Sequence, residues 1–302
     1  MNAFIKADKV SKNFGAHKVL KEVSFKVDKG KVVGLLGPNG AGKTTIIRLL
    51  NGVIIADGGS MEIGGWNPRV NGHEIRKMCG ILTDGAGMYF EMSGAENLEF
   101  FAKIYGTYEK KRIQTLLEEF ELAEHQKKKV GLYSTGMKKR LGMIKALLHR
   151  PQILFLDEPT NGLDPEGIRL VYDYVSRLNH EEGTTIFLCS HILHQLEDVC
   201  HSFMFLENGS ILESGTKQEL EEKYINQVTL RVETGLNIKS DLWNGLQVKN
   251  LGVKGFEFKL SNKGEIAPLL QKIAEESWIH DVHIQNRDLE SLYFKIRGES
   301  NE

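Results

Sequence analysis

Three short stretches of the chain are apolar at nearly every position, and each ends at a glycine or a polar residue. They are Val32–Leu36, which stops at Gly37, Ile153–Leu156, which stops at Asp157, and Thr184–Cys189. Continuous apolar runs of this length are typical of strands that are buried on both faces. The pattern therefore predicts an α/β core in which helices cover both sides of a sheet.

Helical periodicity follows the first of these strands. Thr44–Leu50 is predicted as a helix that ends near Asn51, and the segment of about residues 85–130 contains helix-period stretches at Asn97–Tyr105 and Arg112–Leu122. We interpret this segment as a helical lobe inserted between the first and second core strands. We assign three aromatic residues to the core of the lobe: Phe100, Phe101 and Tyr105.

The pattern changes near residue 224. Val228–Val232 and Phe256–Leu260 alternate between apolar and polar residues, as half-buried strands do, and a helix (Glu265–Glu276) and a further strand (Ile279–Ile284) follow. We therefore predict a small α+β accessory domain over residues 224–302. It carries no chemical motif, and two hypotheses for it stay open: that it stabilises a dimer, or that it senses a ligand.

Composition and charge restrict the classes of function. The chain has 302 residues, of which 41% are hydrophobic and 26% charged, and 39 basic against 40 acidic residues give a net charge of -1. No global positive field is available to hold nucleic acid, so we expect no nucleic-acid partner. The N-terminus lacks the apolar stretch of a signal peptide, no run is long enough to span a membrane, and the three cysteines show no metal-ligand spacing. We expect a cytosolic protein that reaches a membrane only through a partner.

A glycine-rich loop carries the strongest chemical signal. Gly37–Thr44 matches the P-loop pattern G-x-x-x-x-G-K-[ST] between a predicted strand and a predicted helix. Glycines let backbone N–H groups surround phosphates, Lys43 adds a positive charge, and Thr44 is placed to hold Mg2+. The alternative, a glycine-rich turn with an isolated lysine, does not explain the flanking strand and helix. The predicted phosphate-binding residues are Gly37, Pro38, Asn39, Gly40, Ala41, Gly42, Lys43, Thr44 and Thr45.

Two carboxylates end the second apolar strand. Asp157 is a candidate anchor for Mg2+, and Glu158 is a candidate general base that polarises the attacking water. Acids that merely cap a helix before Pro159 are the alternative, which the P-loop upstream disfavours.

With these motifs in this order, residues 3–223 resemble the nucleotide-binding subunits of ABC transporters. Four further segments carry the resemblance: Tyr133–Met137 resembles the signature loop, Asn161–Asp164 the D-loop, Cys189–His191 the switch histidine, and Phe14 the aromatic residue that stacks on adenine. The resemblance implies a P-loop ATPase domain over residues 1–223 and ATP with Mg2+ as cofactors. It also implies that Glu158, His191 and Lys43 are catalytic, and that His191 contacts the γ-phosphate.

The resemblance further implies a pair of chains. In the family, Ser134 and Gly136 of the signature loop cover the ATP of another copy, and Asp164 contributes from the D-loop. One P-loop and one signature loop therefore predict a homodimer, or a dimer with a similar subunit. The dimer would drive a separate integral membrane permease from the cytoplasmic face of the membrane. The Tyr-Ser-x-Gly-Met form of the signature resembles that of bacterial drug, antibiotic-peptide and sodium exporters.

Two positions depart from the family pattern. Thr135 and Met137 replace the first glycine and the glutamine of the usual signature, and Asp84 stands where the family has a glutamine that binds Mg2+. We assign Asp84 as a third metal ligand, since a carboxylate binds Mg2+ but adds negative charge beside the phosphates. Two other functions stay open: a soluble ABC ATPase that acts on ribosomes or DNA, and a nucleotide-gated regulatory module without catalysis.

Overall fold

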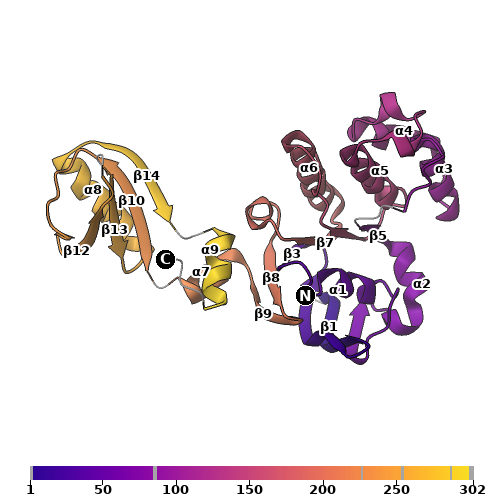
Figure 1. Ribbon diagram of the computed structural model, residues 1–302, viewed down its shortest axis with the longest axis horizontal. Helices are drawn as coiled ribbons and strands as arrows, with labels where there is room; N and C mark the ends of the chain where they lie inside the picture. The colour runs from indigo at the N-terminus through magenta and orange to yellow at the C-terminus, as the bar shows by residue number, and fades with distance from the viewer. Residues whose placement is uncertain (1–2, 84–86, 226, 253–254, 286–287, 299–302) are drawn as a thin grey trace. The chain divides into compact units, whose positions relative to one another are not determined.

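The structure of the chain is a computed structural model that describes residues 3–83, 87–225, 227–252, 255–285 and 288–298. The chain divides into two compact units, Met1–Ser214 and Gly215–Glu302, which Figure 1 colours from indigo to yellow along the sequence. Helix α7 (Lys217–Tyr224) packs against α9 (Leu289–Ile296) within the second unit. The second unit therefore begins before the predicted start at residue 224, because α7, which the sequence analysis assigned to the first domain, packs with the second unit.

A six-stranded sheet in the order β5-β6-β7-β3-β8-β9 forms the centre of the first unit. Strands β5, β6, β7, β3 and β8 run parallel, and every residue of β3, β6 and β7 is buried. Figure 1 shows α1 and α2 on one side of this sheet and α5 and α6 on the other. The predicted α/β fold is confirmed. The bounds are β3 Val32–Leu36, β5 Cys79–Leu82, β6 Ile153–Asp157, β7 Thr185–Ser190, β8 Ser202–Glu207, β9 Ser210–Gly215, α1 Lys43–Leu50, α2 Pro68–Met78, α5 Thr135–Leu147 and α6 Pro165–Glu182.

An antiparallel sheet in the order β2-β1-β4 lies beside α1 and was not predicted. Its strands are β1 (Ala3–Phe14), β2 (His17–Asp28) and β4 (Gly58–Ile63). Val23, Phe25 and Val27 are buried in the core of the first unit, and they alternate with exposed residues along β2. This alternation is the strand signal that the sequence analysis overlooked.

The helical lobe follows β5 and precedes β6, so it lies in the chain between the two predicted core strands, β3 and β6, as expected, whereas β5 itself was not predicted. Strand β5 is short and contains Gly80, whose added Cβ would lie 2.3 Å from the carbonyl oxygen of Ala146. The close approach of α5 to the strand requires a glycine at this position. Because glycine is more typical of turns than of strands, the sequence pattern did not predict β5. The lobe consists of α3 Gly94–Ile104, α4 Lys110–Glu119, two 3-10 turns η1 Ala123–His125 and η2 Val130–Leu132, and the N-terminal part of α5.

Two aromatic residues of the lobe are exposed instead of buried. Phe100 is 36% and Tyr105 is 38% exposed, and Tyr89 and Phe90 beside them are 50% and 58% exposed. The prediction that Phe100 and Tyr105 belong to the core of the lobe is therefore wrong. Helical period identified the apolar face of α3, but it does not show whether another element of the same chain covers that face.

The second unit is a five-stranded sheet in the order β11-β12-β13-β10-β14, with antiparallel pairing throughout. Its core joins Leu230, Phe256 and Phe258 of the sheet to Leu269 and Ile273 of α8. Among the described residues, no helix of either unit combines the length and apolar character needed to cross a membrane. The bounds are β10 Val228–Thr234, β11 Leu242–Trp243, β12 Leu246–Asn250, β13 Gly255–Leu260, η4 Lys263–Glu265, α8 Ile266–Glu276 and β14 Ile279–Gln285.

Candidate nucleotide-binding site

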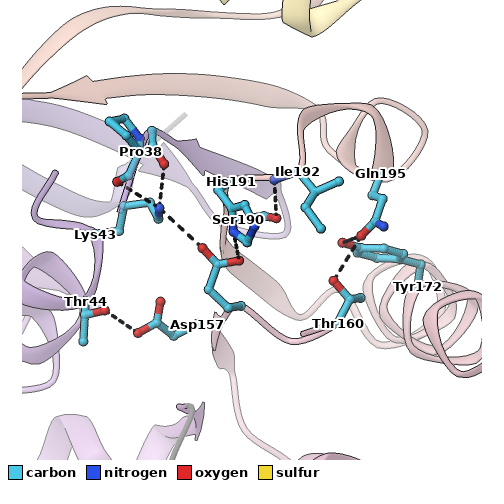
Figure 2. Close-up of polar contacts among 12 residues, drawn as sticks. Pro38, Lys43, Thr44, Asp157, Thr160, Tyr172, Ser190, His191, Ile192 and Gln195 are labelled. Atoms are coloured by element: carbon cyan, nitrogen blue, oxygen red, sulfur yellow. Dashed lines mark hydrogen bonds and ion pairs between the residues drawn. The ribbon is translucent and has the colours of Figure 1, made fainter. Parts of the chain in front are cut away.

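The P-loop connects β3 to α1, and its lysine is held by the backbone of the loop itself. Lys43 Nζ donates to the carbonyl oxygens of Gly37, at 2.6 Å, and Pro38, at 3.3 Å (Figure 2). The side chain is only 6% exposed. A buried ammonium group requires such partners, because burial without them is costly. The loop therefore fixes a positive charge at the bottom of the site.

Two glycines let the loop pass close to neighbouring strands. A Cβ at Gly37 would lie 2.1 Å from the carbonyl oxygen of Leu206, and a Cβ at Gly42 would lie 2.7 Å from the side chain of Leu20. Gly42 also has φ 113° and is the N-cap of α1. Among the described residues, no side chain caps this helix and no acid lies in its first turn, so its first N–H groups face the loop and favour an anion.

Thr44 and Asp157 meet across the site. Thr44 Oγ1 donates to Asp157 Oδ2 at 2.6 Å, which joins the first turn of α1 to the end of β6 (Figure 2). A hydroxyl and a carboxylate are hard oxygen ligands, and Mg2+ in nucleotide sites usually has one or two protein carboxylates together with phosphates and water. The pair fits that donor set. No cluster of three or more His, Cys, Asp or Glu suited to a metal occurs among the described residues. Asp84, the third predicted ligand, lies outside the described residues.

Glu158 follows β6 in a strained backbone conformation. Its φ is 48°, a left-handed value that costs a residue other than glycine about 1–3 kcal/mol. The backbone N–H donates to the carbonyl oxygen of Cys189 at 2.9 Å, which continues the pairing with β7. The two adjacent carboxylates have different partners: that of Asp157 contacts Thr44, whereas that of Glu158 contacts Lys43 and His191.

The two oxygens of Glu158 have different surroundings. Oε2 lies 2.9 Å from His191 Nδ1, whereas Oε1 lies 3.4 Å from Lys43 Nζ. Oε1 is buried and has no hydrogen-bond partner among the described residues, so its contact with Lys43 is an ion pair only. A buried carboxylate oxygen with free acceptor capacity is chemically suited to take a proton from water.

His191 lies at the end of β7, in a turn that Ser190 stabilises. Ser190 Oγ accepts a hydrogen bond from the N–H of Ile192 at 3.0 Å (Figure 2). The His191 side chain is 40% exposed, so one face of the ring is open. Only the imidazolium form of His191 has two N–H donors and can therefore donate to Glu158 and to a phosphate oxygen at the same time.

A pocket of about 200 Å³ lies above the P-loop. This volume is below the roughly 300–1,000 Å³ of sites that enclose a whole small ligand, and it matches a triphosphate better than a complete nucleotide. Val19 of β2 also lines the pocket, a residue that the sequence analysis missed because it did not predict β2. The predicted residues that line it are Pro38, Asn39, Gly40, Gly42, Lys43, Thr44, Thr45, Asp157 and Glu158.

Four other predicted residues lie elsewhere on the first unit. Phe14 is 49% exposed at the end of β1, with Lys12 Nζ 5.5 Å from its ring centre. Ser134 caps α5 by accepting from the N–H of Met137 at 3.2 Å, and Asp164 caps α6 by accepting from the N–H of Gly167 at 3.0 Å. Neither these three residues nor Gly136 lines the phosphate pocket.

The signature loop and the D-loop contact each other within the chain. An added Cβ at Gly162 would lie 2.8 Å from the side chain of Thr135, and one at Gly136 would lie 3.4 Å from that of Leu163. Each of the two loops leads into a helix, α5 or α6, and neither loop lines the phosphate pocket of this chain.

Comparison with known proteins gives the same family. Residues 20–161 match the ABC transporter family. The bacitracin transport ATP-binding protein BcrA of Enterococcus faecalis is 36% identical over 223 residues, which cover 74% of this chain and 72% of that protein. The uncharacterized ABC transporter ATP-binding protein YhcH of Bacillus subtilis is 32% identical over 306 aligned residues, which cover all of this chain and 98% of that protein.

Similarity to a solved structure extends this result to the fold. The solved structure of the ATP-binding subunit of an ABC transporter superposes with a TM-score of 0.69 at 30% identity, and the match covers 73% of this chain and 93% of that one. The match in sequence and fold accompanies a P-loop and a buried Glu158 carboxylate that line one pocket, and a switch histidine, His191, that contacts this carboxylate. The chain therefore belongs to the ABC transporter family, as one of its ATP-binding and ATP-hydrolysing subunits.

Proposed function

We propose that this chain powers the export of a drug, peptide or ion through a separate membrane permease at the cytoplasmic face of the cell membrane. The observation that carries the ATPase part is the buried Glu158 carboxylate between Lys43 and His191. The export part draws support from relatives named for bacitracin transport, linearmycin resistance and daunorubicin resistance.

In this proposal, the residues of the pocket share the work of hydrolysis. The loop amides and Lys43 bind the β- and γ-phosphates, and Glu158 Oε1 accepts the proton of the attacking water. His191 holds Oε2 and orients toward the γ-phosphate from its exposed face. Thr44 and Asp157 would hold Mg2+, which supplies neutralisation of the phosphate charge when bound.

Two copies are needed in this proposal because the site is incomplete in one. The pocket has room for the phosphates, while Ser134 is exposed and Gly136 half-buried at a helix N-terminus that favours anions. A second chain would bring its signature loop to the γ-phosphate of the first. Phe14, exposed at the end of β1, would stack on the adenine.

The lobe provides a surface for the permease. Tyr89, Phe90 and Phe100 form an exposed aromatic patch, in which Tyr89 and Phe100 pack edge to face at 5.0 Å. Exposed aromatic clusters on otherwise polar proteins mark sites of protein association. We therefore propose that this patch, the lobe aromatic patch, contacts an apolar cytoplasmic segment of the permease.

Affinity isolation of the tagged chain from detergent-solubilised source cells tests the partner. We expect a polytopic membrane protein to copurify, and the double variant Tyr89→Ala, Phe90→Ala to lose it. Trp66→Ala is the matched control, because Trp66 is also an exposed aromatic residue, at 43%, but lies outside the patch. Copurification of ribosomal proteins or DNA instead would reject the transporter while leaving the ATPase chemistry intact.

A further inference from the structure

Gln195 connects three segments of the first unit, and it has no role in the mechanism described above. It lies in the 3-10 turn η3 (Leu193–Leu196), which follows the switch histidine His191. Its side chain is half-buried and points toward the end of β6 and toward α6, as Figure 2 shows. Nothing in its sequence context marks it as functional.

A single oxygen of Gln195 accepts two hydrogen bonds. Thr160 Oγ1 donates to Gln195 Oε1 at 3.0 Å, and the Tyr172 hydroxyl donates to the same atom at 3.3 Å (Figure 2). Thr160 is two residues beyond Glu158, whereas Tyr172 lies on α6. The side chain thus joins three segments that are separate in the sequence.

Burial makes this acceptor necessary. Thr160 is 3% and Tyr172 is 8% exposed, and a buried hydroxyl without an acceptor destabilises the fold. Burial also raises the pKa of Tyr172 to about 12, so the phenol remains a donor throughout the neutral range. Both donors are therefore oriented on Gln195 Oε1 under ordinary conditions.

The topology gives these two bonds a catalytic consequence. The D-loop, Asn161–Asp164, begins directly after Thr160 and leads into α6, so Gln195 bonds to the residue before the loop and to the helix that follows it. Four residues before Gln195, His191 contacts Glu158 at 2.9 Å. The segment that carries the switch histidine is therefore tied twice to the segment that carries the base, once at Glu158 and once at Thr160.

We propose that Gln195 is a positioning residue that holds His191 and the D-loop at fixed positions relative to Glu158. This inference rests on the proposed role of Glu158 in hydrolysis. Gln195 touches neither phosphate nor water in this scheme, so its loss should slow the chemical step and leave ATP binding intact. Misplacement of catalytic groups by about 1 Å can lower a rate by roughly 100-fold.

Steady-state phosphate release and nucleotide binding by the full chain test the inference. Gln195→Leu should lower kcat by about 10- to 100-fold and change the KM for ATP by less than about twofold. Gln195→Glu should keep kcat within about threefold of the wild type, because a carboxylate oxygen accepts the same two bonds. Gln114→Leu is the matched control, since Gln114 makes its side-chain bond, at 2.7 Å to Glu118, on α4 and away from the site.

Substitution of the two hydrogen-bond donors, Thr160 and Tyr172, provides a second test with a smaller expected effect. Tyr172→Phe and Thr160→Val should each lower kcat less than Gln195→Leu does, and adding either to Gln195→Leu should have no further effect, because the three residues act as one unit. Wild-type kcat in Gln195→Leu, or full additivity of the double variants, would overturn the inference. Equal loss of kcat in the Leu and Glu variants would also overturn it, because the acceptor oxygen would then not be the active feature.

These experiments distinguish failure of the proposed ATPase function from failure of the positioning role of Gln195. A wild-type chain that binds ATP but releases no phosphate over multiple turnovers would reject hydrolysis by Glu158 itself. Normal wild-type turnover with an unaffected Gln195→Leu variant would reject only the positioning role.

Discussion

The phosphate pocket and the signature loop differ in how far one chain completes them. In the pocket, Lys43 contacts Glu158 and the loop backbone, Thr44 contacts Asp157, and the side chains of Lys43 and Glu158 are less than 10% exposed. At the signature loop, Ser134 is exposed and, among the described residues, its side chain makes only the local bond that caps its own helix. In the proposed dimer both regions would belong to one nucleotide site, of which the described residues of a single chain assemble only the first.

This difference indicates which steps, phosphate binding or hydrolysis, a single chain can carry out. Charged groups that are buried must have their partners in place before the ligand arrives, because an unpaired buried charge is costly. An exposed helix N-terminus has no such requirement, since water satisfies its N–H groups. Binding of phosphates should therefore depend on one chain, and hydrolysis on two.

Loss of the base should have the largest effect. Glu158→Gln retains the size of the side chain and an acceptor for His191 but cannot take a proton, so turnover should fall by about 100-fold or more while ATP remains bound. Phosphate release and equilibrium binding of ATP measure the two properties. Glu166→Gln, in the exposed first turn of α6, is the control that should leave both unchanged. Wild-type turnover in Glu158→Gln would remove Glu158 from the mechanism.

Loss of the signature serine should have an intermediate effect that depends on a second chain. Ser134→Ala should lower turnover by about tenfold and leave ATP binding to the single chain unchanged. Ser93→Ala is the matched control, because Ser93 caps α3 by the same kind of bond and both variants lose about 1 kcal/mol of helix capping. Phosphate release and ATP-dependent light scattering are the measurements. An equal loss of turnover in both variants would mean that capping, and not contact with a second chain, is the role of Ser134.

Loss of Phe14, the exposed aromatic residue at the end of β1, should weaken the binding of ATP without changing the catalytic step. Phe14→Ala should raise the Kd for ATP by about fivefold, since stacking of a base on an aromatic ring contributes about 1 kcal/mol or more. Phe90→Ala is the control, because Phe90 is similarly exposed and also has a lysine over its ring, at 5.2 Å. If both variants bind ATP as the wild type does, the adenine lies elsewhere.

The stability of the fold should depend weakly on pH through the contact that joins the end of α5 to β5. His149, just beyond α5, has Nε2 3.0 Å from the carbonyl oxygen of Cys79 in β5, and burial lowers its pKa below the ordinary value of 6.5. Because the unfolded chain then binds the proton more readily, stability is fully present above pH 6.5 and is lost as the pH falls below it. The Tm should therefore decrease more between pH 7 and pH 5.5 in the wild type than in His149→Gln. Equal decreases would exclude His149 as the cause.

Local chemistry made the phosphate half of the site predictable. The P-loop residues and the pair Asp157–Glu158 are contiguous in sequence, and each depends on a strand and a turn that its own apolar pattern defines. Strand β5 and the sheet β2-β1-β4 were missed because Gly80 interrupts one pattern and because the alternation in β2 was not weighed. Val19 was missed with them, since a pocket wall formed by another sheet leaves no motif.

The sequence by itself determined the family, the P-loop, the two carboxylates and the change of domain type, because these depend on short-range patterns of glycine, charge and apolar period. Only the tertiary structure decided that Oε1 of Glu158 is buried without a hydrogen bond from the described residues, that Gln195 joins Thr160 to Tyr172, and that Phe100 is exposed. These facts depend on which distant segments pack together. Long-range packing is set by the whole core, and no single stretch of the chain encodes it.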